Sequence, residues 1–200
     1  HPHCRRQRQM CIRDRNGAGK STLVKTIMNM VKPNGGYVKI FGRAPKAGIS
    51  RIGYVPQRET VDWDFPVTVM DVVLMGRYGH LGWLRKIGET DRRIACECLE
   101  QVHMLPYANR QIGNLSGGQQ QRVFLARALA QESSLYLMDE PFAGVDAVTE
   151  KTIVSILKGM RDRGKTLVIV HHDLASAREY FDHLLFCLLY TSDAADDNVG

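Results

Sequence analysis

A glycine-rich turn that opens onto a helix constrains this chain more than any other feature. Asn16-Gly17-Ala18-Gly19-Lys20-Ser21-Thr22 matches the second half of the phosphate-binding pattern G-x-x-x-x-G-K-[ST]. Small residues let backbone N–H groups close around phosphate oxygens, and a helix N-terminus adds positive potential. Lys20 would reach the β and γ phosphates, and Ser21 would ligate magnesium. The turn therefore predicts a nucleoside triphosphate site between a strand and a helix.

The first glycine position of this pattern is held by Asp14. Its carboxylate would face the negative charge of the triphosphate, and its side chain resists the tight turn that glycine permits. Taken alone, the segment also fits an ordinary glycine-rich turn before a helix.

A pair of carboxylates stands at the end of an apolar run, Leu135-Tyr136-Leu137-Met138-Asp139-Glu140. Magnesium-nucleotide chemistry needs this arrangement, because Asp139 can hold the metal, usually through water, and Glu140 can orient the attacking water or accept its proton. Taken alone, an acidic strand end also fits a helix cap or a turn.

Helical and strand-like patterns alternate along the middle of the chain. The alternation predicts an α/β layer architecture, and the short apolar runs are typical of buried parallel strands. We expect helices over residues 21–30, 91–104, 119–131 and 148–160, and strands over 36–41, 51–55, 135–138 and 166–170.

The two ends do not match this middle. Residues 1–15 show no strand alternation where a phosphate-binding loop needs a strand, and residues 187–200 turn small and acidic. Both ends resemble translated sequencing-adapter read-through. We therefore expect residues 1–15 and 187–200 to be aberrant and disordered, the first strands to be missing, and the natural frame to cover about 16–186. The alternative is a real disordered arm and tail.

Composition excludes several classes. The net charge of +6 does not form a basic stripe, because five arginines and one aspartate fall in the first 15 residues, so we expect no nucleic-acid partner. Five cysteines without a C-x-x-C pair fit a reducing compartment. No apolar run approaches the roughly 20 residues that span a bilayer, so any membrane role would come from a partner.

A second anion-seeking helix start follows at Leu115-Ser116-Gly117-Gly118-Gln119. One chain cannot readily use two such sites on one phosphate. Here the sequence resembles the ATP-binding-cassette (ABC) family, in which this signature segment of one subunit closes over ATP held by the phosphate loop of another.

The resemblance covers about residues 16–186 and implies a P-loop NTPase core with a mostly parallel sheet and an inserted helical lobe at about 58–130. Gln57 matches the glutamine that contacts magnesium and water, and His172 matches the switch histidine at the γ phosphate. Asp146 matches the loop that communicates across the dimer. The family pattern thus assigns catalysis to Glu140, His172 and Gln57, and Mg²⁺ to Ser21, Gln57 and Asp139. It assigns ATP to residues 16–22, Ser116, Gly117, Gly118, Gln119 and Asp146.

The amino-acid sequence of residues 60–79 and of His171-His172-Asp173-Leu174 resembles that of the family branch that imports manganese, zinc or chelated iron. That resemblance implies an ATP hydrolase, peripheral on the cytoplasmic face of the inner membrane, that forms a head-to-tail dimer. Its partners would be a membrane permease and, indirectly, a metal-binding capture protein. Two alternatives stay open: a cassette ATPase outside transport, and an inactive truncated fragment.

Because Asp14 would repel the triphosphate, we expect Asp14→Gly to strengthen binding of MgATP. The measurement is the rise in melting temperature on adding MgATP, since a ligand at about 100 times its dissociation constant stabilises a protein by about 2.7 kcal/mol. An equal rise in melting temperature in the parent and the variant would show that Asp14 does not weaken MgATP binding.

Overall fold

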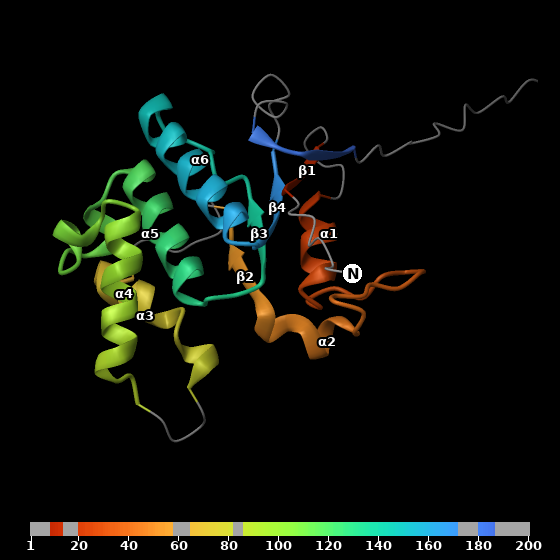
Figure 1. The fold of residues 1–200 in the computed structure, drawn as a ribbon, viewed down its shortest axis with the longest axis horizontal. Coiled ribbons are helices and arrows are strands. Elements are labelled where there is room, and N and C mark those ends of the chain that lie inside the picture. Colours follow the sequence, from red (N-terminus) through yellow and green to blue (C-terminus); the bar gives the residue numbers. More distant parts are fainter. Residues whose placement is uncertain (1–8, 14–19, 58–64, 82–85, 172–179, 187–200) are drawn as a thin grey trace, which may run out of the picture.

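The computed structural model describes residues 9–13, 20–57, 65–81, 86–171 and 180–186 (Figure 1). The strands are β1 (Gln9–Arg13), β2 (Ile52–Val55), β3 (Leu135–Asp139), β4 (Thr166–Val170) and β5 (His183–Phe186). The α-helices are α1 (Lys20–Ile27), α2 (Pro45–Gly48), α3 (Val69–Met75), α4 (Glu89–Gln101), α5 (Gly117–Ala130) and α6 (Ala147–Asp162). Short 3₁₀ turns cover Ile49–Arg51, Tyr78–His80, Leu105–Tyr107 and Ile112–Asn114.

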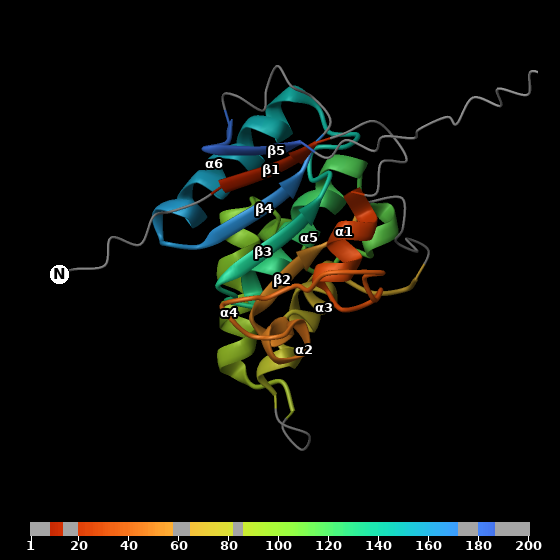
Figure 2. The same cartoon turned by 90° about the vertical axis from the view of Figure 1, so that its right-hand side faces the viewer.

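The described strands form one sheet in the order β2-β3-β4-β1-β5, and every pairing is parallel (Figure 2). The carboxyl ends of all five strands therefore lie at the same edge. Such an edge, where strands hand over to loops and helices, is the usual ligand site of a parallel α/β sheet.

Alternate side chains of the central strands feed two cores. Leu137 and Val170 pack with Val24 of α1 and with Met28 just after that helix, whereas Tyr136 and Met138 join the larger core on the other face. Figure 1 shows α1 on one side of the sheet and α5 and α6 on the other. The strands thus have apolar cover on both faces, as their continuous apolar runs predict.

Helices α3, α4 and α5 pack together as a helical lobe (Figure 1). Val72, Val73 and Leu99 are buried between them. The lobe is joined to the sheet through α5, which contacts β2 and leads into β3. The prediction of an α/β core with a parallel sheet and a helical lobe is confirmed, and the lobe's bounds at about 58–130 stay a prediction.

Two expectations about strands are wrong. Gln9–Arg13 forms β1, which pairs with β4 on one side and β5 on the other, so a strand does stand before the phosphate loop. A parallel strand paired on both sides needs no alternation, which is why its pattern was missed. Residues 36–41 form no strand. Ile40 makes one isolated bridge to Arg43, and positive φ angles of 51° at Phe41 and 77° at Gly42 turn the chain there.

The other predicted elements are present with shifted ends. The first helix stops at Ile27 rather than residue 30, because Asn29 takes a left-handed φ of 58°. The helix expected to reach residue 104 ends at Gln101, and His103 turns the chain with a φ of 55°. Residues 1–8 and 187–200, expected to be disordered, lie outside the described residues, and the boundaries at 16 and 186 stay predictions. Within the described part of the chain, no helix is long and apolar enough to cross a membrane.

Gly53 of β2 lies opposite Tyr136 of β3, and a Cβ atom there would come within 2.5 Å of the Tyr136 ring. Because Tyr136 is only 1% exposed, the ring has no room to retreat. We expect Gly53→Ala to lower the free energy of unfolding by about 1–3 kcal/mol, measured by urea denaturation. Gly35→Ala, whose Cβ meets nothing within 4 Å, is the matched control, and an equal effect in both variants would contradict the packing argument.

Candidate functional site

The carboxyl edge of the sheet brings Gln57 and Glu140, two of the predicted catalytic residues, together next to Asp139. Asp139 is the last residue of β3 and stands in register with Val170, the last residue of β4. The Glu140 amide donates to the Val170 carbonyl at 3.1 Å, which holds Glu140 beside the end of β4. Gln57 follows the end of β2, which pairs with β3. Residues 83 positions apart in sequence thus become neighbours.

Gln57 and Glu140 contact each other directly. The Gln57 Nε2 atom donates to the Glu140 carboxylate at 3.4 Å, at the long end for a hydrogen bond. Glu140 takes a left-handed φ of 51°, which is uncommon for a residue with a side chain. Backbone strain of this kind clusters at functional sites, where the surrounding structure holds it. The strain and the amide contact together fix where the carboxylate points.

Asp139 is buried, with 5% of its surface exposed. The pKa of the nearby Tyr54 is raised, first by burial and then by the negative charge of Asp139. The phenol therefore stays neutral, and Asp139 sets a negative potential at this edge. A negative potential there favours a cation.

The donor set at this edge fits magnesium held together with phosphates. Among the described residues no cluster of three or more His, Cys, Asp or Glu side chains could hold a metal by itself. Mg²⁺ usually takes only one or two protein carboxylates and completes its shell with substrate phosphates and water. Asp139 with the Gln57 amide suits that mode and does not suit a closed transition-metal site.

The phosphate turn falls partly outside the described residues, which omit Asn16, Gly17, Ala18 and Gly19. β1 ends at Arg13, and α1 begins at Lys20 and continues through Ser21. Thr22, in the first turn of α1, is exposed. The strand and the helix that a phosphate loop joins are therefore both present. His172 also lies outside the described residues.

The signature segment forms the capped start of α5. The Ser116 hydroxyl accepts from the Gln119 amide at 3.3 Å, and the Gln119 side chain accepts from the Ser116 amide at 2.9 Å. This reciprocal pair is a capping box, which satisfies two backbone donors at the helix start. Gly117 and Gly118 are the first helical residues, so no large side chain covers the N-terminus of α5.

The start of α6 lies against the start of α5. A Cβ at Gly118 would lie 3.3 Å from the Thr149 hydroxyl, and that hydroxyl donates to Asp146 at 2.9 Å. Ser116 and Asp146 are both exposed, and Val148 beside them is 76% exposed. The structure thus gathers the signature segment and Asp146 into one exposed surface.

Asp146 is the N-cap of α6. Its carboxylate accepts from the amides of Val148 and Thr149 at 3.0 and 2.9 Å. The pKa of Asp146 is lowered, first by the bond from the Thr149 amide and then by the one from the Thr149 hydroxyl. Within the single chain, Asp146 therefore caps the N-terminus of α6.

His171, given no catalytic role in the sequence analysis, is 4% exposed. Its ring centroid lies 5.3 Å from that of Phe142 and 6.0 Å from that of Phe181. This ring packing places the residue that precedes His172 in the core.

Sequence reasoning gave no role to Arg77, although it is 6% exposed. It is a lone cation after the apolar run Val72–Gly76, and that signal could have marked it.

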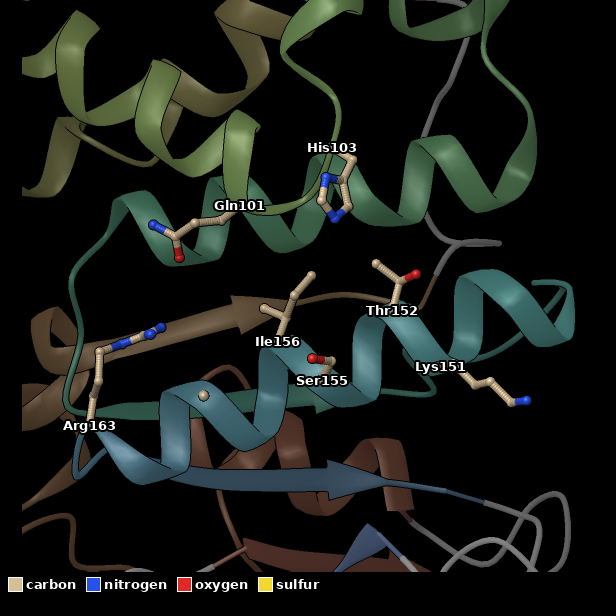
Figure 3. Close-up of a pocket in the computed structure, with 8 residues that line it drawn as sticks. Gln101, His103, Lys151, Thr152, Ser155, Ile156 and Arg163 are labelled. Carbon is tan, nitrogen blue, oxygen red and sulfur yellow. The ribbon is translucent and has the colours of Figure 1, made fainter.

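A groove of about 470 Å³ opens away from this edge, between α6 and the segment that ends α4 (Figure 3). His103 points from the lobe toward Thr152 and Ile156 of α6, and Arg163 extends toward Gln101. None of the predicted site residues that the structure describes lines this groove.

Comparison with known families decides the identity. Residues 3–143 match the family model described as ABC transporter. The chain belongs to the ABC transporter family. Its relatives include the zinc transport system ATP-binding protein TroB of Treponema pallidum, 58% identical over 170 residues, which are 85% of this chain and 64% of TroB. The manganese transport system ATP-binding protein MntB of Bacillus subtilis is 56% identical over 85% of this chain and 68% of MntB. The chain thus spans about two thirds of the length of these ABC relatives.

Solved cassettes share the fold. The dimeric post-hydrolysis structure of the ATP-binding cassette MJ0796, bound to ADP and Pi, has a TM-score of 0.79 and 31% identity. It covers 90% of this chain and 81% of that cassette. The ABC ATPase fold expected from the sequence is confirmed.

The lowered pKa of Asp146 makes its stabilising effect depend on pH. Its contribution is present above the usual pKa of 3.8 and is lost as the pH falls through the lower folded value. We expect Asp146→Asn, which keeps a neutral cap, to melt below the parent at neutral pH and to approach the parent only as the pH falls below 3.8. Melting temperatures of both proteins from neutral to acid pH test this, with the exposed Glu100→Gln as baseline. A gap that stays constant with pH would contradict it.

Proposed function

We propose that this chain is the ATP-hydrolysing subunit of an importer for manganese, zinc or chelated iron. The observation that carries the ATPase part is the meeting of Gln57, Asp139 and Glu140 at the carboxyl edge of the sheet, next to the strand and helix that flank the phosphate turn. Two relatives are named as ATP-binding proteins of a zinc and a manganese transport system, and these names support a transition metal as the cargo.

In this proposal ATP binds at the phosphate turn. Backbone amides of Asn16, Gly17, Ala18 and Gly19 surround the phosphates, Lys20 neutralises them, and Thr22 stands in the first turn of α1. Ser21, Gln57 and Asp139 hold Mg²⁺, in keeping with the buried carboxylate at the end of β3. When bound, Mg²⁺ neutralises charge that develops on the phosphates.

Glu140 supplies the base. Its carboxylate orients a water molecule and accepts its proton as the water attacks the γ phosphorus, while ADP leaves and phosphate forms. Gln57 holds the Glu140 carboxylate through its amide, and the 3.4 Å contact between them supports this role. His172 contacts the γ phosphate and stabilises its charge.

A second copy completes each ATP site. Ser116, Gly117, Gly118 and Gln119 of one copy close over the ATP bound to the other, with Asp146 at the contact. The exposed surface that joins the start of α5 to Asp146 and Val148 supports this arrangement, and the MJ0796 cassette is dimeric. The start of α5, where Gly117 and Gly118 are the first helical residues, suits capture of a partner's phosphates.

The work of closure passes to a membrane permease through the helical lobe. The subunit then sits peripherally on the cytoplasmic face of the inner membrane, and a metal-binding capture protein delivers the cargo on the other side. The transported metal is a substrate of the assembly and contacts the other subunits.

Two alternatives remain to be set against this proposal. The names of the relatives, all transport systems, disfavour a cassette ATPase outside transport. An inactive fragment is favoured by one observation, Asp14 at a glycine position of the phosphate pattern. Binding of MgATP by the parent chain would contradict the inactive-fragment alternative, and a failure to bind would favour it.

We expect Glu140→Gln to keep MgATP binding and to lower the rate of hydrolysis by about 10²–10⁴-fold, because the amide cannot accept the proton. The variant should also accumulate an ATP-bound dimer. Phosphate release and size-exclusion chromatography with MgATP measure both. Glu100→Gln, an exposed carboxylate on α4, is the control, and normal turnover by Glu140→Gln would remove Glu140 from the role of base.

A further inference from the structure

Helix α5 links the two parts of the proposed ATP site. Ser116 caps its first turn, and after Ala130 the chain passes through Gln131–Ser134 into β3, which ends at Asp139. A helix of 14 residues is about 21 Å long, so a small rotation at its C-terminal end displaces Ser116 by several ångströms. The angle of α5 against the sheet therefore decides where the signature segment lies relative to Glu140.

The connection after α5 is short and bent. Ser134 already belongs to the core, because its amide donates to the Arg51 carbonyl at 3.2 Å and its carbonyl accepts from the Thr166 amide at 3.0 Å. Between it and the helix, Glu132 takes a left-handed φ of 46°. Few residues are left to absorb a change of angle, so Glu132 is the natural pivot.

Arg77 holds this pivot from the lobe side. Its Nη1 atom donates to the Ala130 carbonyl, the last residue of α5, at 2.7 Å and to the Glu132 carboxylate at 2.6 Å. Its Nε atom donates to Asp91 of α4 at 3.0 Å. One guanidinium therefore ties the end of α3, the start of α4 and the end of α5 together. A cation also suits the negative end of a helix dipole.

Arg77 and its partners Ala130, Glu132 and Asp91 form a cluster that we call the node, and further contacts of Asp91 and His80 support it. Asp91 also accepts from the Gly88 amide at 3.1 Å and so caps α4. His80 lies in the turn after Arg77, and its Nε2 atom is 2.9 Å from the Gln131 carbonyl. Arg77 and His80, both after the end of α3, thus contact the connection between α5 and β3.

The lobe has room to change its angle. The groove of about 470 Å³ in Figure 3 separates Gln101 and His103 of the lobe from the face of α6. A second cavity of about 310 Å³ lies between α4 and Arg163, with Glu132 on its wall. Close packing does not lock α4 to α6 at these places, so polar contacts at the pivot have more influence on the angle.

We propose that Arg77, with Glu132 and Asp91, is a positioning device that sets the angle of α5 and thereby places Ser116, Gly117 and Gly118 for the second copy's ATP. Arg77 touches neither nucleotide nor water and acts through α5. The proposal rests on the proposed function, because it assumes that α5 presents those residues to ATP.

A purely stabilising role explains the node less well. Burying the Arg77–Asp91 pair, whose side chains are 7% and 14% exposed, costs desolvation energy that often cancels the attraction, so such a pair is weak support for stability. The 6% exposed guanidinium fixes geometry instead, since its planar fork reaches three acceptors in set directions.

The test compares Arg77→Lys and Glu132→Ala with Glu97→Ala. Lysine keeps the charge but cannot reach the same three acceptors, and Glu132 is half-exposed, so its loss leaves the fold intact even where Arg77→Lys does not fold. Glu97 belongs to the exposed pair with Arg93 on α4 and is the matched control. Each variant is measured for MgATP affinity as a monomer and, in the Glu140→Gln background, for the ATP concentration that gives half-maximal dimer.

We expect both node variants to bind MgATP within about twofold of the parent and to need about tenfold more ATP for dimerisation, a usual size for coupling between sites. Glu97→Ala should shift neither value by more than about twofold. Hydrogen exchange should quicken at residues 131–134 and stay unchanged at residues 116–119, because α5 turns as a rigid body rather than unfolding at its start.

The outcomes are separable. Failure of the parent to bind MgATP or dimerise overturns the proposed function, and hydrogen exchange then still tests the node by itself. A parent that dimerises while Glu132→Ala behaves like Glu97→Ala overturns the positioning role. Equal losses of MgATP affinity and dimerisation also overturn it, because they would show a general loss of structure.

Discussion

Parallel hydrogen bonding of β3 to β2 and β4 is the constraint on which the rest of the structure depends. It aligns Val55 with Met138 and Asp139 with Val170, so the three strands end at one level. Any side chain that follows a strand end then joins the same edge, however far apart the residues are in sequence. Gln57 meets Glu140 for this reason, and β1 hands over to the phosphate turn beside β4. The chemistry is a property of the edge rather than of any single loop.

Helix caps set where three of the helices begin. Capping boxes at Thr68 and Ser116 start α3 and α5, and the N-cap Asp146 starts α6. Ser116 and Asp146 satisfy backbone donors within one chain and remain exposed, which leaves the same surface available to a second copy. Structural capping and the proposed contact with ATP thus use neighbouring atoms. At the other end of α5, Arg77 donates to the Ala130 carbonyl, much as the Ser116 hydroxyl accepts from the Gln119 amide at the start of the helix.

Much of the fold and the site was predictable because the signals are local. The apolar run before Asp139, the glycines at 117 and 118 and the apolar residues Ala95, Cys98 and Leu99 of α4 each appear within a short window. β1 escaped prediction because its place in the sheet comes from β4 and β5 on either side, and not from its own pattern. The false strand at 36–41 failed for the converse reason: among the described residues it has no strand to pair with beyond the Ile40–Arg43 bridge.

The sequence by itself determined the family, the α/β class and the identity of the carboxylates, since the spacing of polar residues after apolar runs is fixed along the chain. Only the tertiary structure decided that Gln57 touches Glu140, that Tyr136 covers Gly53, and that Arg77 joins three helix ends. Those contacts link residues tens of positions apart, and sheet register and helix packing set them. No local pattern encodes a distance of that kind, because burial of the whole core selects it.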